Sequence, residues 1–296
     1  MKLSELINGG KETISVLYPE REAKEIVYAY LENYIGTKRH THIIDPEYSV
    51  PSEKAGIALE AFHRMASGEP LQYITGKAWF YGREFNVTPD VLIPRPETEI
   101  LCSNVLKTDF VAAAPKVLDL CTGSGCIAWT LSLEMPRAEV TAVDISEAAI
   151  KVASSQDFAE ELSIIGATAP KFFRADILQD VLPSEVAGVD KFDVIVSNPP
   201  YVMDSEKALM RTNVLDHEPH LALFVPDDDP LVFYRAVARH AARHLTEQGF
   251  GIVEINEALG EETADVFRNH GFVSYVLKDL HDKDRFVCFS YNKCRE

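Results

Sequence analysis

The sequence predicts an α/β protein in which a mostly parallel β-sheet, covered by helices on both faces, follows a small helical domain. Residues 1 to about 75 carry apolar positions at helical spacing. From about residue 115 onward, short apolar runs alternate with helical segments, as expected of a parallel sheet with crossover helices. We therefore expect a helical domain over residues 1–75, a β-hairpin and linker over 76–95, and an α/β domain over 96–296.

The charge balance restricts the partners that the protein can bind. The chain of 296 residues has 29 Lys and Arg against 46 Asp and Glu, a formal net charge of −17. Because nonspecific nucleic-acid affinity comes mostly from clustered Lys and Arg, this balance argues against a broad phosphate-binding surface. The charge balance is compatible with a local basic patch, but it favours a basic protein as the partner. We expect no direct nucleic-acid binding.

The cysteines and the N-terminal segment point to the cytoplasm. The cysteines show neither a disulfide framework nor zinc-binding spacing, and they fit a reducing compartment: Cys102, Cys121, Cys126, Cys288 and Cys294. The first residues include Glu5 and Glu12 and form no apolar run, unlike a signal or transit peptide. No stretch reaches the roughly 18 apolar residues of a membrane helix. We expect a cytoplasmic monomer without a metal site or membrane contact.

Two segments of the first domain have the pattern of amphipathic helices. One carries apolar residues at helical spacing from Ala23 to Tyr34, between Pro19 and Gly36. The other runs from Pro51 to Gly68 with Ala58, Ala61, Phe62 and Met65 on one face. These stripes suit the core of a small bundle better than a groove for a partner.

The segment between the domains contains a β-hairpin and two prolines. Residues 78–87 alternate as two short strands with a turn near Gly82. The stretch Leu92 to Glu99 follows, its two prolines fix an extended or turned segment, and a helix can begin after Pro96. We expect this linker to lie over the mouth of the next domain.

Seven strands are expected in the α/β domain, at residues 116–120, 139–144, 171–174, 192–197, 250–256, 272–278 and 285–291. Only the short polar stretch 279–284 separates the last two, which suits a hairpin, so we expect one strand at the sheet edge to run antiparallel. The acidic run 227–229 lies between prolines and is typical of a solvated loop rather than a cation site.

A glycine-rich loop follows the first of these strands and predicts a nucleotide-type site. Glycines at this position let the backbone turn sharply and approach a ligand. The loop begins with Cys121, Thr122, Gly123, Ser124 and Gly125. Asp144, at the end of the next strand, can accept hydrogen bonds from two ribose hydroxyls. Asp176 ends the third strand and can accept an adenine amine, with Ile177 against the ring; a helix N-cap is the competing interpretation of Asp176.

The loop alone does not separate NAD from S-adenosyl-L-methionine (AdoMet), because Gly123, Gly125 and Ala128 also satisfy the dinucleotide fingerprint. A glycine-rich turn without a ligand is a third possibility. Two details favour AdoMet. Asp119 would repel a pyrophosphate but suits the ammonium group of a methionine. Cys121 also stands where the tightest turn glycine of a dinucleotide site is expected.

The fourth strand runs directly into Asn198-Pro199-Pro200-Tyr201, a motif suited to holding a planar nitrogen. The Asn198 side-chain oxygen can accept one N–H and the Pro199 carbonyl the other, which aligns a weakly nucleophilic amide nitrogen with a methyl donor. Pro200 supplies no competing N–H, and each proline restricts the residue before it. Tyr201 offers a flat face to a planar amide or base. The alternative is a simple strand-ending turn, but hydride transfer has no use for two such acceptors, so the motif favours AdoMet.

The sequence resembles the PrmC/HemK family of release factor glutamine methyltransferases over nearly its whole length. The resemblance rests on residues 68–76, 80–82 and 85–87, the segment Ile93 to Glu99, the glycine loop, residues 197–201, Glu218-Pro219 with Ala222-Leu223, and residues 284–287. Nucleic-acid amino-methyltransferases share the Asn-Pro-Pro-Tyr motif, whereas the helical domain and the Pro94–Glu99 segment are more specific. Two departures are Cys121, in place of the first loop glycine, and residues 225–229, in place of a glycine-containing turn.

The resemblance implies a class I AdoMet-dependent methyltransferase domain, with a seven-stranded Rossmann-like sheet, behind a helical substrate-docking domain. It also implies methylation at N5 of the glutamine in the Gly-Gly-Gln motif of class 1 peptide chain release factors, with S-adenosyl-L-homocysteine as the second product. Residues 121–125 and Asp144 would contact AdoMet, with Asn198 between cofactor and glutamine. The alternative function is an adenine N6 or guanine N2 methyltransferase acting on nucleic acid, against which the net charge of −17 argues. A non-catalytic AdoMet-binding protein is a third hypothesis.

Overall fold

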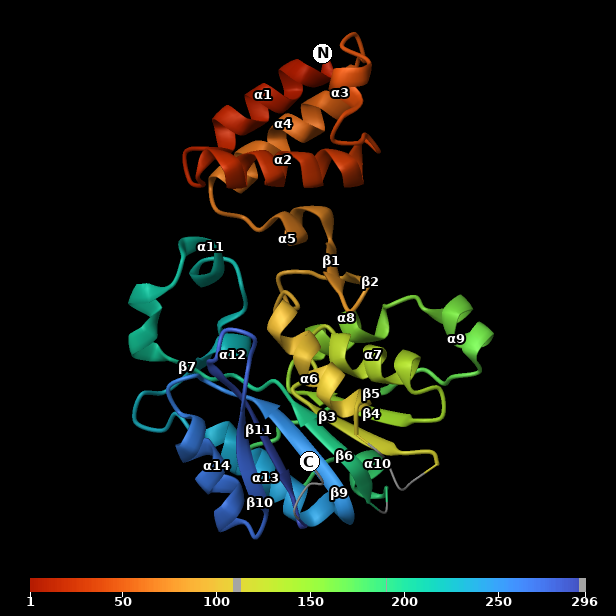
Figure 1. The fold of residues 1–296 in the computed structure, drawn as a ribbon, viewed down its shortest axis with the longest axis vertical. Coiled ribbons are helices and arrows are strands. Elements are labelled where there is room, and N and C mark those ends of the chain that lie inside the picture. Colours follow the sequence, from red (N-terminus) through yellow and green to blue (C-terminus); the bar gives the residue numbers. More distant parts are fainter. Residues whose placement is uncertain (109–112, 190, 293–296) are drawn as a thin grey trace. The chain divides into compact units, whose positions relative to one another are not determined.

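A computed structural model describes residues 1–108, 113–189 and 191–292, so Cys294 lies outside the described residues. The chain forms two compact units (Figure 1). The first comprises Met1–Lys77 together with Met210–His217. The second comprises Ala78–Leu209 and Glu218–Glu296. The short segment 210–217 thus belongs to the helical unit, although it lies within the range that the sequence assigns to the α/β domain.

The first unit is helical and has a core of its own. Its helices are α1 (Leu3–Ile14), α2 (Glu20–Tyr34), α3 (Thr41–Ile44), α4 (Ser52–Ala66), α5 (Leu71–Thr75) and α11 (Thr212–Leu215). The core contains Val27 and Leu31 of α2 and Ala58, Phe62 and Met65 of α4. The two apolar stripes noted in the sequence therefore form this core.

The second unit begins with a hairpin of β1 (Lys77–Phe80) and β2 (Arg83–Asn86). Tyr81 and Gly82 both have positive φ, +50° and +75°, as a two-residue type I′ turn requires. The expected turn near Gly82 is therefore confirmed. The Arg83 guanidinium holds the hairpin on the unit by ion pairs to Glu134 at 2.7 Å and Glu161 at 2.5 Å.

A seven-stranded sheet forms the centre of this unit, in the order β10-β11-β9-β6-β3-β4-β5. The strands are β3 (Lys116–Leu120), β4 (Glu139–Asp144), β5 (Lys171–Arg174), β6 (Phe192–Ser197), β9 (Leu245–Glu254), β10 (Val273–Lys278) and β11 (Asp284–Ser290). The five strands from β9 to β5 pair in parallel. The predicted α/β class and all seven strands are confirmed, with shifts of bounds in the last three.

The antiparallel strand is not at the edge of the sheet, and that expectation was wrong. β11 pairs antiparallel with both β9 and β10 and lies between them, while β10 forms the edge. After β9, the chain passes through α14 (Gly260–Asn269) and forms the edge strand β10, which leaves a gap one strand wide between β10 and β9. The hairpin turn then folds β11 back into this gap.

Alternating residues of the strands face two layers of helices (Figure 1). Leu118, Val143 and Ile195 pack in the core that contains α10 (Ser184–Ala187), α13 (Val232–His244) and α14. Val117 and Val140 pack in the core that contains α6 (Pro96–Leu106), α7 (Cys126–Glu134) and α9 (Ala159–Ile165). This period of two is the consequence of strand geometry.

The remaining elements are short and connect the larger ones: α8 (Glu147–Ser154), β7 (Val202–Met203), a 3₁₀-helix (Asp204–Leu209), α12 (His220–Leu223) and β8 (Phe224–Val225). Within the described ranges, none of the helices combines the length and the apolar character needed to cross a membrane.

Candidate active site

A cavity of about 320 Å³ opens at the carboxyl ends of the parallel strands, where ligands bind in open α/β sheets. It lies entirely within the second unit. Most of the residues expected to bind the cofactor line it: Cys121, Thr122, Gly123, Ser124, Asp144, Asp176, Ile177 and Asn198. Gly125 is absent from its lining.

The glycine loop between β3 and α7 has a backbone that few other residues could adopt. Gly123 and Gly125 have φ of +55° and +80°. A Cβ on Gly123 would meet no atom within 4 Å, so its conformation is what requires glycine. At Gly125 a Cβ would lie 2.9 Å from the Ala153 Cβ, so this glycine also permits close packing of α7 against α8. Cys121 is strained as well, with φ of +65°.

Asp144 anchors the loop and faces the cavity. Its Oδ2 accepts a hydrogen bond from the Gly123 N–H at 2.8 Å, and its Oδ1 accepts one from the Ser146 N–H at 2.9 Å. Burial raises the pKa of this carboxyl group, and the two N–H groups lower it. Each carboxylate oxygen can accept a second hydrogen bond, which is what two ribose hydroxyls would need.

Asp176 precedes a turn rather than a helix, so the N-cap interpretation was wrong. Its Oδ1 accepts a hydrogen bond from the Leu178 N–H at 2.9 Å, and the Gln179 N–H bonds the Asp176 carbonyl oxygen at 3.1 Å. The next helix, α10, begins only at Ser184. Asp176 and the buried Ile177 line the same part of the cavity.

Asp119 lies beneath the loop and not in the cavity lining. It is fully buried, and its Oδ2 accepts a hydrogen bond from the Thr122 hydroxyl at 2.6 Å. Burial raises the pKa of this carboxyl group to about 7; the Thr122 hydroxyl opposes the shift and Asp144 adds to it. Asp119 therefore supports the loop from below through Thr122.

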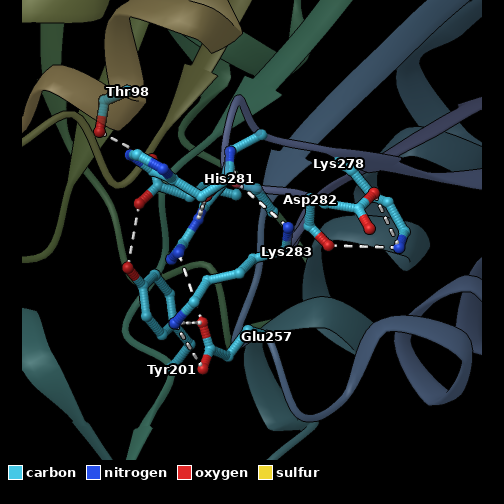
Figure 2. Close-up of polar contacts among 10 residues, drawn as sticks. Thr98, Tyr201, Glu257, Lys278, His281, Asp282 and Lys283 are labelled. Atoms are coloured by element: carbon cyan, nitrogen blue, oxygen red, sulfur yellow. Dashed lines mark hydrogen bonds and ion pairs between the residues drawn. The ribbon is translucent and has the colours of Figure 1, made fainter.

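The Asn198-Pro199-Pro200-Tyr201 segment reaches the cavity with Asn198 and Pro200, whereas Pro199 and Tyr201 are absent from its lining. The Asn198 Nδ2 donates a hydrogen bond to the Thr98 Oγ1 at 3.1 Å. The Tyr201 hydroxyl donates one to the Glu254 Oε1 at 3.0 Å (Figure 2). Burial, followed by the charge of Glu254, raises the pKa of Tyr201 well above its usual value, so the phenol stays protonated and remains a donor.

Sequence reasoning missed several residues around this segment. Glu254 and Thr98 hold its side chains, and Leu92, Pro94 and Arg95 of the linker line the cavity. The Arg95 guanidinium lies 2.5 Å from the buried Glu218 carboxylate, which fixes the linker on the α/β unit. The expectation that the linker lies at the mouth of this domain is confirmed. Glu254 could have been found, because it ends an apolar strand as Asp144 does.

The residues around the cavity fit AdoMet. The volume of about 320 Å³ is within the range of small-molecule sites, roughly 300–1,000 Å³. Asp144 has capacity for ribose hydroxyls, Gly123 leaves open space beside its backbone, and Ile145 and Ile177 provide apolar walls for a purine. Among the described residues, no cluster of His, Cys, Asp and Glu could hold a metal ion.

Two family models match the chain and together cover most of it. The PrmC N-terminal domain matches residues 5–76. The methyltransferase small domain matches residues 96–221. The second match contains the glycine loop, Asp144, Asp176 and the Asn198–Tyr201 segment, so it supports AdoMet as the cofactor.

Two relatives of similar length carry the same name. The chain is 35% identical over 280 residues to a release factor glutamine methyltransferase of Flavobacterium psychrophilum, covering 93% of this chain and 94% of that one. It is 38% identical over 278 residues to a release factor glutamine methyltransferase of Bacteroides thetaiotaomicron, covering 94% and 96%.

Solved structures show the fold. A crystal structure of the hMettl16 catalytic domain, in complex with the MAT2A 3'UTR hairpin 1, has a TM-score of 0.53 at 12% identity, with 82% of each chain covered. At this identity the likeness extends to the fold alone. The protein is thus a methyltransferase that uses AdoMet, and the chain belongs to the family of release factor glutamine methyltransferases.

Proposed function

We propose that this enzyme methylates N5 of the glutamine in the Gly-Gly-Gln motif of class 1 peptide chain release factors. The observation that carries the proposal is the position of Asn198, whose side chain lines the same cavity as the glycine loop and Asp144. Because the Asn198 Nδ2 is bonded to Thr98, its Oδ1 is the atom available to accept an N–H. The names of the relatives support a release factor as the substrate.

The residues bind and orient a poor nucleophile. The lone pair of an amide nitrogen is delocalised into its carbonyl, so alignment is most of the catalytic task. The Asn198 Oδ1 accepts one N–H of the substrate amide, and the Pro199 carbonyl oxygen accepts the other. Pro200 donates no competing N–H. Pro199 and Tyr201 lie outside the cavity lining, so their roles require the substrate amide to extend beyond the cavity, where the Tyr201 ring can lie against it. The glycine loop residues, Asp144, Asp176 and Ile177 hold the cofactor.

When bound, AdoMet supplies an electrophilic methyl group on a positively charged sulfur. The glutamine nitrogen gains this methyl group and loses one proton, which water can accept because the amide becomes acidic as the bond forms. No strong general base is needed next to Asn198.

The partner surfaces follow from charge and domain organisation. A net charge of −17 favours a basic, RNA-binding release factor over nucleic acid itself. We propose that the helical domain of residues 1–75 docks the release factor, that residues 76–95 connect it to the catalytic domain of residues 96–296, and that the enzyme acts as a cytoplasmic monomer.

The substrate is tested by competition between classes. Labelled AdoMet is incubated with the enzyme and either purified class 1 release factors or adenine- and guanine-containing DNA and RNA. We expect label on the release factor, at the glutamine of Gly-Gly-Gln. Label on nucleic acid but not on the release factor would overturn the proposal in favour of the nucleic-acid amino-methyltransferase.

The role of Asn198 is tested by its substitution with alanine. Asn198→Ala removes an acceptor for the substrate amide, so we expect methyl transfer to fall by about a hundred- to a thousandfold, as for a lost oriented group in other enzymes, while AdoMet affinity changes little. Turnover and calorimetric AdoMet binding are measured beside Asn104→Ala, an asparagine of α6 whose Nδ2 bonds the Ile100 carbonyl oxygen. Parallel loss of both properties would mean that Asn198 chiefly holds the cofactor.

A further inference from the structure

A buried carboxylate lies behind the Asn198–Tyr201 segment and receives hydrogen bonds from two hydroxyl groups. Glu254 ends β9 and is 1% exposed. The Thr98 Oγ1 donates to its Oε2 at 2.7 Å, and the Tyr201 hydroxyl donates to its Oε1 at 3.0 Å. Figure 2 labels Thr98 and Tyr201, the two residues whose hydroxyl groups donate these hydrogen bonds. Three segments distant in sequence therefore meet at one acidic group.

The direction of these hydrogen bonds is determined by the carboxylate. An ionised carboxylate can only accept, so the single Thr98 hydroxyl proton must point to Glu254. The Thr98 oxygen then presents only lone pairs to Asn198. Its partner at 3.1 Å must be a donor, which is the Asn198 Nδ2. The order Asn198 to Thr98 to Glu254 leaves the Asn198 amide one favourable orientation.

The orientation matters because the two ends of an asparagine amide have opposite hydrogen-bonding properties. With Nδ2 at Thr98, the Oδ1 is the end that can accept an N–H in the cavity. An amide rotated by 180° would present its NH₂ group to the NH₂ of the substrate, donor against donor, and would direct its oxygen at the Thr98 lone pairs. A buried polar group without a hydrogen-bond partner is unfavourable, so the mismatch at each end of the amide would oppose the rotation.

The surroundings of Glu254 contain groups that favour and groups that oppose its charge. Burial raises the pKa of the carboxyl group, whereas the hydroxyls of Thr98 and Tyr201 and the positive charge of Arg285 in β11 lower it. Glu97, beside Thr98 on α6, also raises the pKa, and the Tyr234 phenol of α13 lies close enough to feel the charge. One hydroxyl group reaches each oxygen of the carboxyl group, and both can donate when Glu254 is ionised.

We propose that Thr98 and Glu254 are positioning residues that set the direction of the Asn198 amide and thereby make its oxygen the acceptor for the substrate nitrogen. This inference rests on the proposed function only in requiring an NH₂ group as the substrate. It gives a chemical role to the Pro94–Glu99 segment, since the threonine of that segment lies at the cavity wall and acts through Asn198.

The test compares Thr98→Val with Thr98→Ser. Valine keeps the shape of the side chain but removes the hydroxyl, so Asn198 and Glu254 each lose their hydrogen bond to residue 98. Serine keeps the hydroxyl and both hydrogen bonds. We expect Thr98→Val to lower kcat for release factor methylation by roughly tenfold or more, with AdoMet affinity within about twofold. Thr98→Ser should retain most of the activity. The matched control is Thr263→Val, which removes the hydroxyl of a fully buried threonine in α14 and should leave kcat unchanged.

Glu254→Gln provides a second variant that does not depend on how Thr98→Val folds. A glutamine NH₂ can donate to Thr98 and reverse the direction of the hydrogen bonds, so kcat should fall while AdoMet affinity is kept. Equal kcat for Thr98→Val and wild type, equal losses for Thr98→Val and Thr98→Ser, or a parallel loss of AdoMet affinity would each overturn the inference.

The wild-type enzyme separates this inference from the proposed function. If the wild type methylates nucleic acid and not the release factor, the proposed substrate is wrong. The same variants are then compared on the nucleic-acid amine, because an acceptor for an NH₂ group is needed there as well. A loss in Thr98→Val with rescue in Thr98→Ser would support the positioning role on either substrate.

Discussion

Asp119 is a carboxyl group that the fold holds in a place where its charge is unfavourable. Its pKa is raised to about 7 by burial, with partial compensation from the Thr122 hydroxyl. A carboxyl group whose pKa is higher in the folded state contributes stability at low pH, and this contribution is lost as pH rises through the folded-state value. For Asp119 the loss extends from about pH 4 to about pH 7.

We expect Asp119→Asn to flatten this dependence, because asparagine resembles the neutral acid and does not titrate. Between about pH 5 and pH 8, without AdoMet, the wild type should lose roughly 2 kcal/mol more unfolding free energy than the variant. Denaturant titrations at both pH values measure this difference. Asp144 and Glu254 also have raised pKa values, so the comparison with the variant is the informative quantity. Equal pH slopes would contradict the prediction.

At the same scale, the sequence predicts some site residues better than others. The glycine loop, Asp144 and Asn198 could be found because each lies in or beside a short local pattern at a strand end. Thr98 and Glu254 were missed because their contact joins residues 156 positions apart. The strand-end rule that identified Asp144 applies equally to Glu254, but the partner of a buried acid depends on packing that one sequence does not reveal.

At the scale of elements, the insertion of β11 between β9 and β10 depends on one glycine. Gly251 of β9 lies opposite Phe289 of β11, and a Cβ on Gly251 would be 2.0 Å from the Phe289 ring. The ring also stacks on Phe267 of α14, with centroids 4.1 Å apart. The aromatic side chain therefore occupies the space that any side chain at position 251 would need.

We expect Gly251→Ala to destabilise the protein by about 2–3 kcal/mol, since overpacking a filled core forces side chains or backbone to shift. Gly56→Ala is the matched control. Gly56 lies in α4, where a Cβ would meet nothing within 4 Å, and alanine should stabilise a helix interior by about 0.5–1 kcal/mol. Chemical denaturation of both variants gives the two values. A destabilisation below about 0.5 kcal/mol at Gly251 would refute the packing argument.

The strands themselves were predictable, but not their full arrangement. The runs from 116–120 to 192–197 are apolar and bounded by polar or turn residues, so β3 to β6 match the expected bounds. The hairpin of β10 and β11 was also expected from the short connection between them. The position of this hairpin relative to β9 was not predictable. The order of strands along the chain shows that β10 and β11 are consecutive, but it does not show that the chain leaves a gap beside β9 after α14.

At the scale of the whole molecule, the net charge is the property that can be obtained most directly from the sequence. The net charge of −17 creates a field that attracts basic partners and repels nucleic acid. The units of the fold are less visible in sequence. Residues 210–217 join the helical unit, yet they form only the short α11, and a helix of that length leaves no periodic signal.

We expect the recognition of the release factor to weaken with salt, because screening shortens the range of surface charges to about 3 Å at 1 M ionic strength. Raising NaCl from 50 to 500 mM should increase KM for the release factor several-fold, through slower association. KM for AdoMet should change much less, since the cavity is formed by short-range contacts. Steady-state kinetics at several salt concentrations measure both, and a salt-independent KM for the release factor would exclude electrostatic recognition.

The position of β11 also has a consequence for biosynthesis. The six other strands of the sheet precede β11 in the chain, so they leave the ribosome before the strand that joins β9 to β10. Until β11 arrives, β9 carries an unpaired edge beside the apolar residues Ile252 and Val253, and such an edge is a template for pairing with another chain. If synthesis stops before Asp284, β9 therefore keeps unpaired N–H and C=O groups along one side. These groups can pair with another chain, so the incomplete protein is prone to aggregation.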